Sequence, residues 1–130
     1  HLLNDHFFLK PFMSAEITQV RPAQLAAWIN AQSSAQAVTP VVLDVREPWE
    51  LERARIKPAQ CDFRAMPMAS IPLRLSELDA DAPIAVLCHH GARSMQVAHF
   101  LVRNGFSNVA NITGGIGAWA SEFDTSIPQY

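Results

Sequence analysis

Short apolar runs alternate with amphipathic stretches along most of the chain. The runs 41–43 and 84–87 are apolar at every position, which is typical of strands buried on both faces of a sheet. The stretch 108–113 predicts another strand, and 60–68 predicts a shorter one in a region that prolines interrupt. The pattern therefore predicts four short strands from the apolar runs alone.

Apolar residues three and four positions apart predict helices between these strands. A first helix should begin at Pro22 and end in the polar residues 33–36, and a second should end at Asn104-Gly105. Their apolar stripes are Leu25, Trp28 and Ile29 in the first helix and Val97, Phe100 and Leu101 in the second. Shorter helices are predicted over 48–56, over 70–81 with Leu75 and Leu78 facing inward, and over 114–123 with Trp119 in the core.

Strands that alternate with helices at this spacing predict an α/β fold. Such strands pair in parallel through right-handed crossovers, and the helices then cover both faces of the sheet. The 130 residues, 49% of them hydrophobic and 17% charged, suit one domain with a single core. We assign this domain to residues 17–130. Residues 1–16 are set aside as an N-terminal extension, a docked arm or a remnant of cloning.

Charge and cysteine content narrow the range of functions. The net charge of −2 lacks the basic excess of nucleic-acid-binding proteins, so the expected partner is a small molecule or another protein. No apolar run approaches the roughly 20 residues that span a bilayer, and no signal peptide is recognisable. Cys61 and Cys88 lack C-x-x-C spacing, which argues against a disulfide framework and a thiolate zinc site. We expect a cytoplasmic protein without membrane contact.

Two further features invite a metal or cofactor interpretation, and neither supports one well. His89 and His90 are adjacent, so their side chains diverge, and no partner pair stands at ligand spacing. Gly114 and Gly115 fit neither the dinucleotide-binding nor the P-loop pattern, and tight packing of a strand against the last helix explains them better. We therefore expect neither a metal site nor a cofactor.

The most reactive side chain stands where the strand 84–87 meets the following helix. Open parallel sheets bind ligands beyond the carboxyl ends of their strands, where loops meet helix N-termini. After Cys88, unpaired backbone amides, the helix dipole and Arg93 would favour a thiolate over a thiol, and Gly91 would let the loop curl. A buried, inert cysteine is the alternative interpretation. The neighbouring glycine, arginine and Ser94 favour the reactive one.

Four segments, in the right order, resemble single-domain rhodaneses. They are VVLDVREPWE (41–50), CHHGARS (88–94), MQVAHFLVRNGF (95–106) and NITGGIGAW (111–119). The resemblance covers residues 17–130 and implies a rhodanese-like domain with a parallel five-stranded sheet and helices on both faces. It also implies sulfurtransferase chemistry: a cysteine thiolate takes the outer sulfur of a small anion such as thiosulfate and becomes a persulfide. The sulfur then passes to cyanide or to a thiol acceptor, and the persulfide of a partner protein can take the place of thiosulfate as the donor.

The resemblance also assigns roles to individual residues. Cys88 is the catalytic nucleophile, Arg46 helps to place the anionic donor, and Asp44 supports the loop. The substrate-binding loop consists of His89, His90, Gly91, Ala92, Arg93 and Ser94. One segment departs from the family pattern: where family members carry Gly-His-Ile-x-Gly-Ala, residues 53–68 keep only Ile56, so the resemblance predicts no conformation there.

Two other functions are compatible with these residues. Phosphatases and arsenate reductases of this fold also use a cysteine-to-arginine loop, and the fold can serve as a non-catalytic interaction module. The module would not require Cys88, Gly91 and Arg93 together, so catalysis is favoured. Only the four residues HHGA separate Cys88 from Arg93, one fewer than in the C-x5-R loop of the phosphatases, and the shorter loop favours a persulfide. Cys61 is expected to be a bystander unless its sulfur can approach Cys88 as a resolving thiol.

Overall fold

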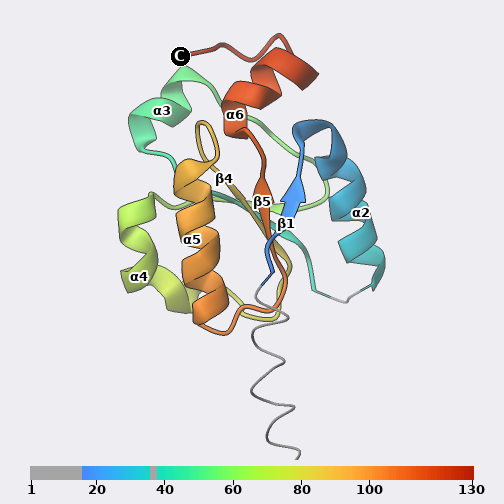
Figure 1. The fold of residues 1–130 in the computed structure, drawn as a ribbon, viewed down its shortest axis with the longest axis vertical. Coiled ribbons are helices and arrows are strands. Elements are labelled where there is room, and N and C mark those ends of the chain that lie inside the picture. Colours follow the sequence, from blue (N-terminus) through green and yellow to red (C-terminus); the bar gives the residue numbers. More distant parts are fainter. Residues whose placement is uncertain (1–15, 36–37) are drawn as a thin grey trace, which may run out of the picture.

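The computed structural model describes residues 16–35 and 38–130 and shows a five-stranded parallel sheet (Figure 1). The strands are β1 (Thr18–Val20), β2 (Val41–Asp44), β3 (Asp62–Ala65), β4 (Ile84–Leu87) and β5 (Val109–Ile112). They lie in the order β1-β5-β4-β2-β3, and every neighbouring pair is parallel. The predicted fold class is confirmed. The N-terminal extension lies outside the described residues, apart from Glu16.

Helices connect the strands. They are α2 (Leu25–Ala35), α3 (Pro48–Arg53), α4 (Ile71–Arg74), α5 (Ala92–Arg103) and α6 (Gly115–Ala118). The 3-10 turns are η1 (Pro22–Gln24), η2 (Met68–Ser70) and η3 (Leu75–Glu77), and α6 continues as a π-type turn, η4 (Trp119–Phe123). In the part of the chain that the structure describes, no helix is long and apolar enough to cross a bilayer.

Alternate residues of the central strands pack against two different helix layers. On one face, Leu43 and Val86 share a core with Ile71 of α4 and with Val97 and Leu101 of α5. On the other face, Val42, Ala85 and Leu87 share a core with Leu25 and Ile29 of α2 and with Ile116 and Trp119. Because both faces are covered, β2 and β4 are apolar at successive positions rather than at alternate ones. The predicted core position of Trp119 is confirmed.

Helix α2 ends at Ala35, within the polar residues 33–36 where its end was predicted, and the Ser34 hydroxyl donates to the Asn30 carbonyl in its last turns. Three elements differ from the prediction. Strand β1 was not apparent from the apolar runs, because only Val20 of its three residues is buried. The helix predicted over 48–56 ends at Arg53, as α3. The helix predicted over 70–81 is only α4 and η3, so Leu78 is buried just beyond the helical turns and Leu75 only partly.

The carboxyl ends of β2 and β4 meet at one edge of the sheet. Asp44 of β2 pairs in register with Leu87 of β4, and the Val45 amide donates to the Leu87 carbonyl at 2.9 Å. The loops that follow β2, β4 and β5 therefore share this edge, which Figure 1 shows beside α3 and α6. The predicted loop after Cys88 lies here.

Candidate active site

Cys88 stands between the last residue of β4 and a tight turn into α5. Its side chain is buried, with only 1% of the residue exposed. Gly91 adopts φ +110°, a conformation that favours glycine, and thereby turns its backbone N–H onto Cys88 Sγ at 3.0 Å. Helix α5 begins at the next residue, Ala92, so the positive end of a 12-residue helix faces the sulfur. The predicted strand-loop-helix joint and the need for glycine at 91 are confirmed.

The backbone of α6 packs against this loop and forms hydrogen bonds with it. The Ile116 and Gly117 amides of α6 donate to the carbonyls of Cys88 and His89, each at 2.9 Å. A Cβ on Gly115 would lie 2.4 Å from the Cys88 carbonyl oxygen, so no larger residue fits there. The paired glycines thus serve close packing, as expected, although they pack against the Cys88 loop rather than against a strand alone.

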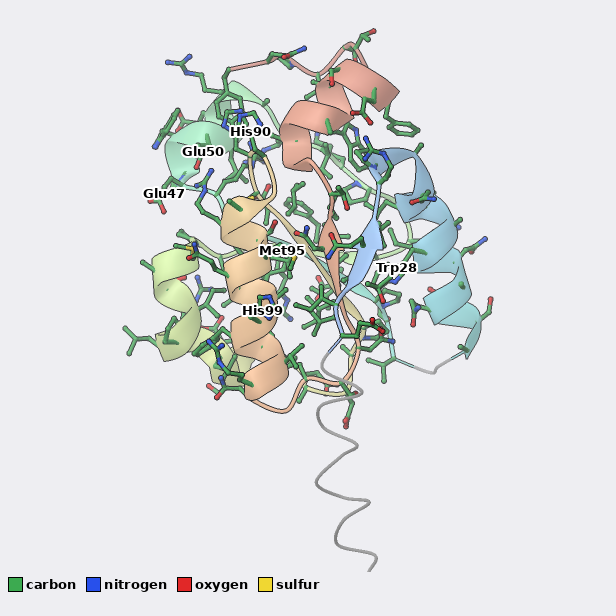
Figure 2. The ribbon with its side chains drawn as sticks, viewed as in Figure 1. Trp28, Glu47, Glu50, His90, Met95 and His99 are labelled. Carbon is green, nitrogen blue, oxygen red and sulfur yellow. The ribbon has the colours of Figure 1, made fainter. Side chains whose placement is uncertain are left out.

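Arg93 is held by Glu50 of α3. Its two terminal nitrogens donate to the two carboxylate oxygens of Glu50 at 2.7 and 2.8 Å. The hydrogen bonds from Arg93 lower the pKa of Glu50 to about 2, although burial opposes the shift, and the pair raises the pKa of Arg93. Figure 2 shows Glu50 and His90 together near the start of α5. Arg93 therefore ties the loop to α3.

The position of Arg46 differs from the prediction. We expected this side chain to help place an anionic donor, but it is completely buried, and Asp44 beside it is as well. Arg46 donates to both Asp44 carboxylate oxygens, to the Ala54 carbonyl at 2.8 Å and to the Tyr130 hydroxyl at 3.0 Å. Burial alone would lower the pKa of Arg46, but the hydrogen bonds to Asp44 and Tyr130 raise it above its ordinary value. Its guanidinium thus joins the end of β2, the residue after α3 and Tyr130, next to the site.

An aromatic cluster covers the other side of the loop. The ring of His89 stacks on His90, with centroids 3.8 Å apart, and on Tyr130, with centroids 3.9 Å apart. The Tyr130 hydroxyl donates to Glu50 Oε2 at 3.0 Å and accepts from Arg46. Burial, and next the charge of His90, lower the pKa of His89, which favours its neutral form. The last residues of the sequence thus brace the loop and both ion pairs.

Glu50 and Tyr130 were missed as site residues in the sequence. Glu50 carries one available signal: it stands three residues after Glu47, as in a capping box, and the Glu47 amide does donate to it at 2.9 Å. Nothing near Tyr130 in the sequence points to a loop 40 residues away. Both residues reach the site through tertiary contacts.

Acid should weaken the contribution of Glu50 to stability. Its pKa falls from an ordinary value of 4.5 to about 2 on folding, so the contribution is complete above about pH 4.5 and is lost as the pH falls towards 2. We expect Glu50→Gln to lower the free energy of unfolding by on the order of 2 kcal/mol at pH 7, allowing for the partial exposure of Arg93. Urea denaturation at a series of pH values should show the difference between variant and parent shrinking below pH 4.5. Glu77→Gln, in the exposed pair with Arg74, is the control, and an equal effect there would contradict the assignment.

A family model for the rhodanese-like domain matches residues 22–122. The chain belongs to the rhodanese-like family. Rhodanese-like/PpiC domain-containing protein 12, chloroplastic, of Arabidopsis thaliana is 42% identical over 93 residues, which are 68% of this chain and 30% of that protein. Thiosulfate sulfurtransferase GlpE of Pseudomonas entomophila is 32% identical over 115 residues, which are 88% of this chain and 95% of GlpE. A rhodanese-related protein from Thermoplasma volcanium has a similar crystal structure, with a TM-score of 0.64, 30% identity and coverage of 82% of this chain and 93% of that one.

The segment that departs from the rhodanese-like pattern is ordered by the core. Between α3 and β3 the chain has no regular structure, but Ile56 is buried in the core beneath α2 and the Ala54 carbonyl accepts from Arg46. Ile56, which the segment shares with the family pattern, thus helps to anchor it in the core.

Cys61 lies at the amino-terminal end of the strands of the rhodanese-like sheet, and Cys88 lies at their carboxyl-terminal end. Val41 of β2 is in register with both Asp62 and Ile84, so Cys61 lies at the amino edge while Cys88 follows the carboxyl end of β4. At about 3.3 Å per residue the two Cα atoms are at least roughly 15 Å apart, whereas a disulfide needs less than about 7 Å. Burial raises the pKa of the Cys61 thiol. The arrangement argues against Cys61 as a resolving thiol.

The structure offers no cluster that suggests a metal. Within residues 16–35 and 38–130, no three His, Cys, Asp or Glu side chains gather closely enough to hold an ion. The groups that the site brings together are the Cys88 sulfur, the Gly91 amide, the N-terminus of α5 and the arginine that Glu50 holds.

Proposed function

We propose that the protein is a sulfurtransferase in which Cys88 carries sulfane sulfur as a persulfide. The donor is a small sulfur-containing anion such as thiosulfate, and the acceptor is cyanide or a thiol, including a thiol of a partner protein. The sulfurtransferase relatives, among them GlpE, support this class of reaction. The domain that carries out this reaction spans residues 17–130. Because a thiol that forms a persulfide must stay reduced, we place the protein in the cytoplasm.

One observation carries this proposal: the Gly91 amide lies 3.0 Å from Cys88 Sγ at the N-terminus of α5. A backbone N–H and a helix dipole aimed at sulfur stabilise negative charge there without any rearrangement during the reaction. The same charge stabilisation serves the attacking thiolate and the persulfide anion that replaces it. Ser94 Oγ, 3.2 Å from the sulfur, adds one more polar contact.

The reaction proposed for Cys88 has two displacements. The thiolate attacks the outer sulfur of thiosulfate, a new S–S bond forms, and the S–S bond of the donor breaks as sulfite leaves with its electron pair. The acceptor then attacks the terminal sulfur of the persulfide, giving thiocyanate from cyanide, and the Cys88 thiolate is restored. Neither step needs an external oxidant or reductant, because in each displacement the leaving group takes the electron pair of the S–S bond that breaks.

Each loop residue has a place in this proposal. His89, His90, Gly91 and Ala92 present the turn of backbone that receives the anionic donor. Arg93 supplies positive charge while Glu50 keeps the guanidinium in place. Arg46 and Asp44 stabilise the site without contacting the donor. Their buried ion pair fixes the segment after β2, which is hydrogen-bonded to the end of β4 just before Cys88. The low exposure of Cys88 favours a small anion over a bulky phosphate ester as the donor.

Two assays on one preparation test this proposal against the phosphatase alternative. We expect transfer of sulfur from thiosulfate to cyanide, and no hydrolysis of an aryl phosphate above that of the Cys88→Ser variant. A loop with four residues between Cys88 and Arg93 makes a smaller ring than a tetrahedral phosphate requires. Phosphate release that depends on Cys88 would overturn the assignment.

A further inference from the structure

The hydroxyl group of Ser94 has more neighbours than it has hydrogens. The side chain is completely buried, and its Oγ lies within hydrogen-bond distance of Cys88 Sγ (3.2 Å), of the Gly91 carbonyl (3.1 Å) and of Asn111 Oδ1. A serine has one hydrogen to donate, so it can serve only one of these acceptors at a time. Which one it serves depends on whether Cys88 is a thiol or a thiolate.

Asn111 connects this serine to the surface. It is a buried polar residue of β5, only 3% exposed, in register with Gln19 of β1. Its Nδ2 donates to Gln19 Oε1 at 3.0 Å, and Thr113 Oγ1 donates to the same oxygen at 3.2 Å. Gln19 is exposed and its Nε2 contacts the sulfur of Met95, which Figure 2 labels on α5. A chain of hydrogen bonds thus leads from Cys88 through Ser94 and Asn111 to an exposed amide.

The placement of the donor and acceptor atoms in this chain fits the thiol. The Cys88 S–H donates to Ser94, Ser94 donates to Asn111 Oδ1, and Asn111 donates to Gln19. When the thiol loses its proton to solvent, the sulfur becomes an acceptor and needs the serine hydrogen. Asn111 Oδ1 would then be left buried without a donor, which is unfavourable.

Turning two amides removes that cost. If the Asn111 amide rotates by half a turn, Nδ2 donates to Ser94 Oγ and Oδ1 faces Gln19, whose own amide then turns to donate. Every bond between Cys88, Ser94, Asn111 and Gln19 is reversed. The turn gives up only the long contacts of Gln19 Nε2 with Met95 Sδ (3.4 Å) and with the Ile17 carbonyl (3.5 Å). The turn of Gln19 costs little because this side chain is at the surface.

We propose that Asn111 is a positioning residue whose amide turns over with the charge on Cys88, so that Ser94 donates to the thiolate. This inference rests on the proposed function for its part in turnover, since sulfur transfer passes through the thiolate. The charged and titratable groups on the elements around the sulfur are His89 and His90 in the loop, Arg93 on α5, Glu50 on α3, the Asp44–Arg46 pair after β2, and Tyr130. Among the described contacts, none of them hydrogen-bonds to Ser94 or Asn111.

The rate of Cys88 alkylation by iodoacetamide tests the inference without any sulfur transfer. All variants are made in a Cys61→Ser background. Asn111→Asp has the same shape but can only accept, so it holds the Ser94 hydrogen away from the sulfur. We expect its alkylation rate at pH 7 to fall about tenfold, and its pH profile to move to higher pH, as the loss of one hydrogen bond to a charged group implies. Asn108→Asp, at the amino end of the same strand, adds the same charge and should leave the rate unchanged.

Two further variants separate this role from a structural one. Gln19→Glu changes only an exposed residue, but a carboxylate at position 19 can only accept, so it holds the Asn111 amide with Nδ2 towards the surface. Alkylation should then slow by about threefold. The control Thr18→Glu should have no effect. Asn111→Leu frees the Ser94 hydrogen for the sulfur, so it should alkylate at least as fast as the parent. The inference is overturned if Asn111→Leu slows alkylation as much as Asn111→Asp, or if Asn111→Asp and Gln19→Glu react at the parental rate. A protein with this alkylation pattern but no sulfur transfer would contradict the proposed function alone.

Discussion

Cys88→Ser is expected to lower thiosulfate:cyanide sulfurtransferase activity by at least about a thousandfold. Serine keeps the size and the hydrogen-bonding neighbours of the side chain, but its hydroxyl is not ionised near neutral pH and cannot carry sulfur as a persulfide. The substitution should therefore lower kcat and leave the fold and its stability unchanged. Steady-state kinetics, with circular dichroism and a urea titration on the same sample, measure both.

Cys61→Ser is the matched control for this prediction. It makes the same chemical change in the other cysteine, which lies at the opposite end of the strands, and it should leave kcat and KM unchanged. Turnover by Cys88→Ser at more than a few per cent of the parental rate would show that another group is the nucleophile. A large loss in Cys61→Ser would revive its role as a resolving thiol.

Asp44→Asn should have the largest effect on stability, lowering the free energy of unfolding by about 3–5 kcal/mol. The carboxylate accepts from the Arg46 backbone amide, from Nε and from Nη2, and both side chains are completely buried. The neutral amide keeps the shape but leaves a buried guanidinium without its counter-charge. Urea denaturation measures the change as a shift in midpoint at constant slope.

An exposed ion pair on the neighbouring strand provides the comparison. Asp62→Asn breaks the contact with Arg64, in which both side chains are about 40–46% exposed, and such pairs contribute between 0 and about 1 kcal/mol. If Asp44→Asn were no more harmful than Asp62→Asn, the buried pair would not be the element that holds the segment after β2.

The parts of the fold that could be predicted are those with local signals. Strands β2 and β4 are apolar at every position because both faces are covered, and α5 shows its stripe of Val97, Phe100 and Leu101. Strand β1 lies at an edge and pairs only with β5, so one buried residue suffices and no run is visible. The helix predicted over 70–81 is divided into α4 and η3, and Leu78 is buried just after them in extended backbone.

The candidate site divides in the same way. The position of Cys88 and the turn at Gly91 depend on neighbours in sequence, and these were predicted. The partners of Arg93 and Arg46 depend on tertiary contacts, because Glu50 lies 43 residues from Arg93 and Tyr130 lies 84 residues from Arg46. Arg46 was therefore expected to meet a substrate, whereas the fold surrounds it with carboxylate, carbonyl and hydroxyl oxygens.

Intact mass spectrometry after incubation with thiosulfate shows whether Cys88 carries sulfur. We expect a gain of one sulfur atom per chain, which a proteolytic digest assigns to the peptide that contains Cys88, and its complete loss when cyanide is added. The Cys88→Ser variant should gain nothing under the same conditions. A parent protein that gains no sulfur, or gains it on Cys61, would rule out Cys88 as the sulfur carrier.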